Sequence, residues 1–140
     1  MIIYTDMVAD LFHYGHYNYI KQINDTYKKE GDLLYIGIHN DIDPQIYKRK
    51  PILTMEERIK VLECCKYVDK IIPNAPVVVD MDYIKKTNID ILVMPDNRTE
   101  EEIKLMYKEP NRLNMIRKVP YTHSISTSDI IKRIKNRIDL

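Results

Sequence analysis

Short apolar runs alternate with segments of helical periodicity along the whole chain. Short runs that are rich in Ile, Leu and Val and bounded by turn residues are typical of buried strands. Five such runs are present, at 1–5, 33–38, 70–73, 90–94 and 113–119. Because helical segments separate them, the pattern predicts an α/β fold, with an open parallel five-stranded sheet and helices on both faces. A length of 140 residues fits one domain over 1–140.

Helices are expected over 15–28, after Thr54, and over 80–87, 99–108 and 127–138. Thr54 with Glu57, and Ser126 with Asp129, have the spacing of capping boxes, which mark helix starts. In the last helix, isoleucines recur on one side and Lys and Arg residues fill the rest. We expect this apolar stripe to pack against the sheet, although a basic amphipathic helix can also touch anionic lipid.

Open parallel sheets bind their ligands beyond the carboxyl ends of the strands, where the strand order reverses. The polar residues that follow the predicted strands therefore identify the candidate site. They are Asp10, His13, His16, Lys48, Asp96, Ser126 and Thr127. The helix that begins near Gly15 adds free backbone N–H groups at the same edge, and such a terminus can hold a phosphate.

The motif His13-Tyr14-Gly15-His16 lies in the loop after the first strand. Two imidazoles beside a helix N-terminus can donate hydrogen bonds to a phosphoryl group whose charge grows during displacement. A zinc site is not expected, because no third ligand stands at a suitable spacing. Mg²⁺ would instead arrive with nucleotide phosphates and use one or two carboxylates. Asp10 is the candidate ligand.

Composition narrows the range of partners. The 22 basic and 21 acidic residues leave a net charge of +1, which favours neither nucleic acid nor an acidic membrane surface as the main partner. No apolar stretch approaches the roughly 18 residues of a membrane span, so stable membrane insertion is not expected. Glycine-rich phosphate loops are absent. The two cysteines, Cys64 and Cys65, are adjacent, which fits a reducing, cytoplasmic location rather than a disulfide framework.

The segment Asp10-Leu11-Phe12-His13-Tyr14-Gly15-His16, together with Ile125-Ser126-Thr127-Ser128, resembles the cytidylyltransferase family, above all its phosphoethanolamine and phosphocholine branches. The resemblance covers nearly the whole chain. It implies a Rossmann-like fold of the HxGH nucleotidyltransferase superfamily. The implied reaction is attack by the phosphate oxygen of a small phosphorylated alcohol on the α-phosphorus of CTP, with release of pyrophosphate. It also implies a homodimer, with contacts near 67–69 and the HxGH loop.

The same resemblance implies roles for individual residues. The catalytic residues would be His13, His16 and Lys48. The nucleotide would contact Val8, Ala9, Asp10, Gly15, Asp96, Ile125, Ser126 and Thr127. The acceptor alcohol would contact Asp41, Val77 and Asp96, and Asp10 would hold the Mg²⁺ that accompanies CTP.

Two departures from the family pattern bear on this prediction. Tyr121-Thr122-His123-Ser124 stands where family members usually carry Arg-Thr-x-Gly, so a guanidinium that clamps CTP phosphates is missing. Arg117, Lys118 or His123 are candidates to replace its charge. Val77 stands where phosphocholine enzymes have an aromatic residue suited to a quaternary ammonium, which favours phosphoethanolamine. Glycerol 3-phosphate as acceptor, an adenylyltransferase of the same fold and a nucleotide-binding protein without catalysis are the alternatives.

Overall fold

The computed structural model describes residues 1–46 and 48–140, and its centre is a five-stranded parallel sheet. The strand order is β3-β2-β1-β4-β5. The strands are β1 Ile2–Met7, β2 Leu33–Ile38, β3 Lys70–Ile72, β4 Ile91–Pro95 and β5 Ile116–Val119. All four ladders are parallel, with Ile3 of β1 opposite Leu34 on one side and Ile91 on the other. The predicted fold class is therefore confirmed.

Both faces of the sheet are apolar and covered by helices. Side chains alternate along each strand, so that Ile3 faces one core and Tyr4 the other. The first core includes Ile20 of α1 and Leu62 of α2, and the second includes Ile84 of α3. Two buried faces explain why the strands read as continuous apolar runs rather than as an alternating pattern.

The helices are α1 Tyr14–Tyr27, the 3₁₀ turn η1 Asp43–Ile46, α2 Met55–Leu62, α3 Met81–Thr87, α4 Glu100–Met106, α5 Lys108–Arg112 and α6 Thr127–Asn136. The predicted capping box at Thr54 and Glu57 is present, with both reciprocal bonds. Ser126 caps α6 by accepting a hydrogen bond from the backbone N–H of Asp129.

The segment before β5 differs from the prediction. One helix over 99–108 was expected, but the chain forms two short helices, α4 and α5. The backbone of Tyr107, between them, is not helical. Pro110 fits the first turn of α5, where a proline removes no intrahelical hydrogen bond. Asn114 then adopts the left-handed conformation, with φ of 58°, and delays β5 until Ile116. Asparagine is one of the few residues that adopt this conformation readily.

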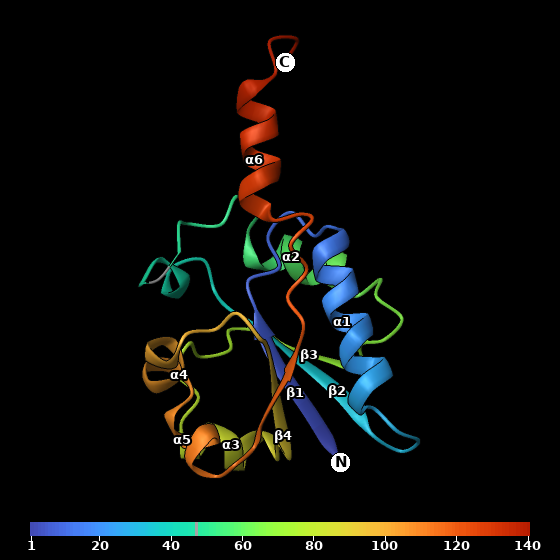
Figure 1. Ribbon diagram of the computed structural model, residues 1–140, viewed down its shortest axis with the longest axis vertical. Helices are drawn as coiled ribbons and strands as arrows, with labels where there is room; N and C mark the ends of the chain where they lie inside the picture. The colour runs from blue at the N-terminus through green and yellow to red at the C-terminus, as the bar shows by residue number, and fades with distance from the viewer. Residues whose placement is uncertain (47) are drawn as a thin grey trace.

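The prediction that the last helix packs on the sheet is wrong. Figure 1 shows α6 extending away from the sheet and its covering helices, with the C-terminus at its far end. No residue of α6 is buried, and Ile134 is 51% exposed. Periodicity identified the apolar face of this helix but carries no information on what covers it. Within the described part of the chain, no helix is long and apolar enough to cross a membrane.

The sheet has its switch point between β1 and β4. From β1 the chain proceeds outward through β2 and β3, then returns to place β4 on the other side of β1. Loops leaving the carboxyl ends of β1 and β4 therefore diverge and open a crevice between them. The ligand edge predicted from sequence coincides with this crevice.

Candidate active site

A cavity of about 590 Å³ lies at the switch point. Its wall includes the residues that leave β1, the start of α1, part of the loop after β2, the turn after β4 and the start of α6. Most of the predicted nucleotide site lines it: Val8, Ala9, Asp10, His13, Gly15, His16, Lys48, Ile125, Ser126 and Thr127. Sequence segments more than 100 residues apart thus meet around one space.

The HxGH motif forms the N-terminal cap of α1. The sequence placed the helix start near Gly15, but His13 is itself the N-cap and its Nδ1 accepts a hydrogen bond from the Gly15 N–H at 3.0 Å. The Nδ1 of His16 in turn accepts from the His13 N–H at 3.1 Å. These two bonds make a capping box in which histidines take both side-chain roles. The spacing of the two histidines is therefore fixed by helix capping.

The capping bonds also set the tautomer of each imidazole. A ring nitrogen that accepts a hydrogen bond carries no proton, so the neutral rings of His13 and His16 hold their proton on Nε2. The His13 Nε2 lies 3.3 Å from Oγ1 of Thr127, a hydroxyl that itself donates to the Asp10 carbonyl oxygen. Both rings consequently bring an N–H donor to the cavity that they line.

Burial keeps the two rings uncharged. Desolvation lowers the pKa of His16 to about 3, assisted by the positive charge of Lys48 and by the unfavourable effect of a proton on His13, and it also lowers the pKa of His13. The ring centroids of His13 and His16 are only 3.9 Å apart, which disfavours charge on both rings at once. Near neutral pH the pair therefore acts as two neutral hydrogen-bond donors.

Gly15 is required by the close approach of its neighbours. A Cβ at this position would lie 2.8 Å from Cε1 of His13 and 3.2 Å from a methyl carbon of Ile125. Contacts below 3.0 Å force a shift, and here the group that must move is a proposed catalytic ring. The glycine of the motif thus leaves room for the His13 imidazole and for the segment leading to α6.

The loop between β1 and α1 has an unusual backbone. Ala9 and Leu11 both lie in the left-handed region, with φ of 56° and 49°, where residues other than glycine are strained. Arg58 of α2 stabilises this loop by donating from Nη1 to the Val8 carbonyl oxygen at 2.6 Å. Its other nitrogens donate to the Leu53 carbonyl oxygen and to Oδ1 of Asp41.

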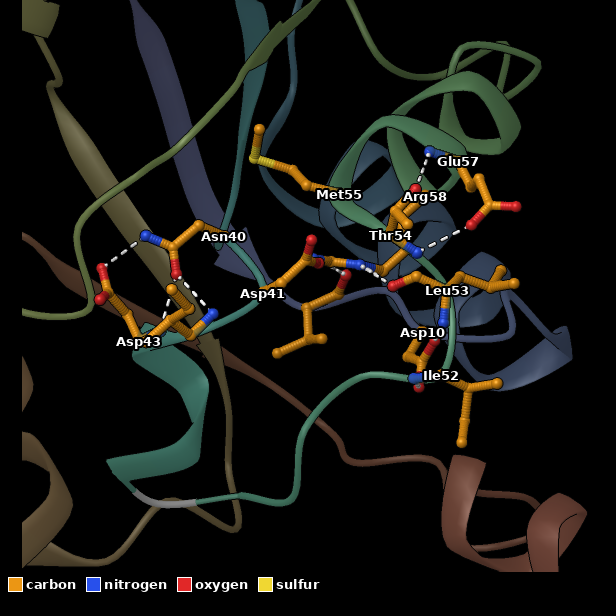
Figure 2. Close-up of polar contacts among 12 residues, drawn as sticks. Asp10, Asn40, Asp41, Asp43, Ile52, Leu53, Thr54, Met55, Glu57 and Arg58 are labelled. Atoms are coloured by element: carbon orange, nitrogen blue, oxygen red, sulfur yellow. Dashed lines mark hydrogen bonds and ion pairs between the residues drawn. The ribbon is translucent and has the colours of Figure 1, made fainter.

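Arg58 thereby ties the exit of β1 to both ends of the loop that follows β2. Figure 2 shows its side chain reaching between Asp41 and Leu53. The guanidinium is fully buried, and its three partners satisfy all of its nitrogens. Arg58 was not among the residues predicted from the sequence to form the site.

Asp10 anchors the same loop at a second point. Its two carboxylate oxygens accept backbone N–H bonds from Ile52 and Leu53, at 2.7 and 2.9 Å (Figure 2). The carboxylate is buried, and both oxygens already have a partner. Asp10 thus anchors the loop between β2 and α2, which carries Lys48 and is called the Lys48 loop below. The sequence did not suggest this role. Its function as a metal ligand stays a prediction.

A buried polar cluster at the inner part of the site was missed by the sequence analysis. Asp6, at the end of β1, lines the cavity and accepts a 2.6 Å hydrogen bond from the hydroxyl of Tyr107 at Oδ1. Its Oδ2 lies 3.7 Å from Nε2 of buried His39 and has no hydrogen-bond partner among the described residues. A buried carboxylate oxygen of this kind is suited to a cationic or hydrogen-donating ligand.

Basic side chains line the same cavity. Lys48 is an exposed residue, but partial desolvation of its ammonium group, together with the nearby charge of Arg98, lowers the pKa of that group. Arg98 follows β4 and pairs with Glu102 at 2.9 Å. Arg98 was not among the residues predicted from the sequence, although it follows a strand end as the predicted residues do. Its position after β4 was the available signal.

Three predicted residues lie outside the cavity wall among the residues described. Asp96 is at the carboxyl end of β4, as expected, but its Oδ1 accepts the backbone N–H of Tyr121 at 3.0 Å. Asp41 is occupied by its ion pair with Arg58. Val77 is 8% exposed and belongs to the second apolar core. The structure therefore gives each of them a structural contact and does not bring them to the cavity wall.

The hypothesis that Arg117, Lys118 or His123 replaces the family arginine is not supported by position. Arg117 donates to the carbonyl oxygens of Asn114 and Ile116, on the strand surface. None of the three is among the residues lining the cavity, whereas Tyr121 is. The arginines that do line it are Arg49 and Arg98.

Fold and cavity define a Rossmann-like α/β protein with its ligand site at the switch point of the sheet. The model of the cytidylyltransferase-like family matches residues 5–133, nearly the whole chain. The chain belongs to this family.

Curated relatives include cytidylyltransferases for two phosphorylated amino alcohols. The chain is 31% identical to a probable ethanolamine-phosphate cytidylyltransferase of Schizosaccharomyces pombe, a match that covers 99% of the chain and 37% of the relative. It is 33% identical to choline-phosphate cytidylyltransferase 2 of Arabidopsis thaliana, over 94% of the chain and 44% of the relative. The chain therefore spans less than half the length of these relatives.

Among solved structures, the lipopolysaccharide core biosynthesis protein of Thermoplasma volcanium has a similar fold. The TM-score is 0.69, at 21% sequence identity, and the match covers 87% of the chain and 98% of that protein. At this identity the similarity supports the fold alone.

Proposed function

We propose that this protein transfers the cytidylyl group of CTP to phosphoethanolamine and releases pyrophosphate. The observation that carries this proposal is one cavity with neutral imidazole donors beside the start of α6 and a buried carboxylate, Asp6, elsewhere in its wall. The first set of groups suits a triphosphate. The second suits an ammonium group.

In the proposed reaction, a phosphate oxygen of the acceptor forms a bond to the α-phosphorus of CTP. The bond from that phosphorus to the bridging α–β oxygen breaks, and pyrophosphate leaves with the electron pair. Such a transfer needs positioning and charge stabilisation more than covalent help from the protein. The Nε2–H groups of His13 and His16 donate to the phosphoryl oxygens, and Lys48 stabilises the growing negative charge.

The acceptor assignment follows from Asp6. Phosphoethanolamine carries an ammonium group, which can donate to the free Oδ2 of this buried carboxylate. Glycerol 3-phosphate has hydroxyls that can donate a hydrogen bond but no positive charge, so its interaction with the carboxylate would be weaker than that of an ammonium group. Choline has no N–H to donate, which makes phosphocholine a poorer fit. The curated relatives that act on ethanolamine phosphate support the same choice.

Mg²⁺ is proposed to enter with the phosphates of CTP. No group of three or more His, Cys, Asp or Glu side chains within residues 1–46 and 48–140 is arranged to hold a metal. Mg²⁺ commonly keeps most of its ligands from water and phosphate and uses one or two carboxylates, and Asp10 stays the predicted carboxylate ligand. Such an ion would neutralise part of the triphosphate charge.

A substrate panel tests the proposal. Pyrophosphate release is measured with CTP or ATP, each against phosphoethanolamine, phosphocholine and glycerol 3-phosphate. The expected result is the fastest release with CTP and phosphoethanolamine. Asp6→Asn should then raise the KM for phosphoethanolamine at least tenfold and leave CTP binding unchanged. Release only with ATP, or with no pair at all, would overturn the proposal.

The assembly is proposed to be a homodimer through the surface around Tyr17 and Tyr67. The two ring centroids lie 6.1 Å apart, and Tyr14, three residues before Tyr17 in α1, is 58% exposed. Exposed aromatic residues of this kind are enriched in protein interfaces. A monomer mass by light scattering at micromolar concentration would contradict this assembly.

The compartment is proposed to be the cytoplasm. Cys64 and Cys65 are both free thiols, which fits a reducing environment. Localisation of a tagged protein by microscopy would test this assignment.

A further inference from the structure

The start of α6 lies beside a cationic side chain that the proposed chemistry has not used. Arg49 lines the cavity, and its Nη1 donates a 3.0 Å hydrogen bond to Oγ of Ser128, in the first turn of α6. The two residues are 79 positions apart in the sequence. Arg49 is exposed, and its bond to Ser128 connects the loop after β2 to the start of α6 at the cavity wall.

Arg49 differs from other charged residues of the cavity wall in the kind of partner that its side chain has. Arg98 is paired with the carboxylate of Glu102, and the Asp10 carboxylate accepts two backbone N–H bonds. Arg49, by contrast, is held by a neutral hydroxyl, and it stands next to a helix N-terminus that carries partial positive charge of its own. Two positive features side by side favour an anion between them.

We propose that Arg49 binds the β- and γ-phosphates of the nucleotide, exchanging the Ser128 hydroxyl for phosphate oxygens. This inference rests on the proposed function, because it assumes a triphosphate in the cavity. The guanidinium offers paired donors that match a phosphate, and the first turn of α6 adds backbone N–H groups. Arg49 thus provides a guanidinium in a site where Tyr121 stands in place of the usual family arginine.

The positions of these residues predict how the triphosphate is oriented in the cavity. The α-phosphate would lie toward His13 and His16, while the leaving pyrophosphate would lie toward Arg49, Ser126 and Thr127. Arg49 would therefore recognise a part of the nucleotide that CTP and pyrophosphate have but CMP lacks.

Calorimetric titration of the full chain tests this directly. Arg49→Gln should weaken binding of CTP and of inorganic pyrophosphate by roughly ten- to a hundredfold, the loss expected for charge-assisted hydrogen bonds, and should leave CMP binding unchanged. Arg49→Lys should restore part of the lost affinity. Lys50→Gln, at an exposed neighbour outside the cavity wall, is the matched control and should bind CTP as wild type does.

A second variant separates phosphate binding from loop anchoring. Ser128→Ala removes the partner of Arg49 but not its charge, so CTP binding should stay within twofold of wild type. If Ser128→Ala weakened CTP binding as much as Arg49→Gln, the arginine would serve only to hold the loop. If wild type bound CTP and Arg49→Gln bound it equally well, the inference would be wrong. A wild-type protein that bound no nucleotide would instead overturn the proposed function.

Discussion

The backbone N–H of His13 donates to Nδ1 of His16 at 3.1 Å, and this bond connects helix capping to the proposed chemistry. It completes a capping box whose other half is the Gly15 N–H bonded to His13. The same two bonds leave Nε2 of each ring as the proton-bearing atom. The motif therefore sets the start of α1 and the direction of two donors at once.

Variants that keep the caps but remove the imidazoles should separate these roles. Asparagine is a good N-cap, and glutamine at N3 can complete a capping box. His13→Asn and His16→Gln should therefore unfold at nearly the wild-type urea concentration. Each should lower kcat by roughly 10²–10³, as loss of an oriented transition-state donor does. Turnover close to wild type in both would contradict the donor role.

His16 also makes the stability of the protein depend on pH. Its folded pKa, about 3, lies below the ordinary value of 6.5. The unfolded chain therefore takes up a proton that the folded chain does not, and stability falls as pH drops below 6.5. Between pH 6.5 and 5 the loss from this group should be about 2 kcal/mol. Above pH 6.5 the protein keeps the whole contribution of His16 to its stability.

Urea titrations at several pH values measure this slope. His16→Gln removes the titrating ring, so its curve should be flatter over the same interval than that of wild type. The pKa of His13 is also lowered, so the unfolding free energy of His16→Gln should still depend on pH, but less steeply than that of wild type. Identical pH profiles for wild type and His16→Gln would show that the buried ring titrates normally.

Gly15→Ala should damage activity while sparing the fold. Alanine is favoured over glycine within a helix by about 1 kcal/mol, which offsets part of the strain from the new contacts. The added Cβ would lie 2.8 Å from His13 and displace its ring. We expect kcat to fall at least tenfold with a melting temperature near that of wild type. A crystal structure of the variant with His13 unmoved, together with normal kcat, would be inconsistent with this reasoning.

Arg58→Met should destabilise both the fold and the site. It leaves the carbonyl oxygens of Val8 and Leu53 without their donor, at an expected cost of about 3 kcal/mol. The Lys48 loop should loosen, which raises the KM for CTP. The control is Arg112→Met, at a surface pair with Glu109, where the change should be below about 0.5 kcal/mol. Equal effects in the two variants would contradict the anchoring role of Arg58.

Local motifs and strand periodicity allowed much of this protein to be predicted from its sequence. The five strands and the capping box at Thr54 follow from spacing along the chain, and His13, Gly15 and His16 stand out as a compact motif. Strand boundaries were less certain, since the residue at which pairing ends depends on the neighbouring strand. Asp6, for example, was outside the predicted first strand but pairs with Gly37.

The parts that escaped prediction depend on distant contacts. Asp6 meets Tyr107 across 101 residues, and nothing near either residue in the sequence indicates the other. Asp10 accepts hydrogen bonds from the backbone N–H groups of Ile52 and Leu53. Such bonds do not depend on the side chains of the donors, so a residue pattern does not predict them. For α6, amphipathic spacing defined a face but not whether that face is covered.

Identification of the reaction product tests directly whether this protein transfers the cytidylyl group of CTP to phosphoethanolamine. The protein is incubated with Mg²⁺, CTP and phosphoethanolamine, and the mixture is analysed by mass spectrometry and phosphorus NMR. We expect CDP-ethanolamine and pyrophosphate in equal amounts, with formation reduced roughly 10²–10³-fold in His16→Gln. Bound CTP that remains intact, with no CDP-ethanolamine over many hours, would contradict it.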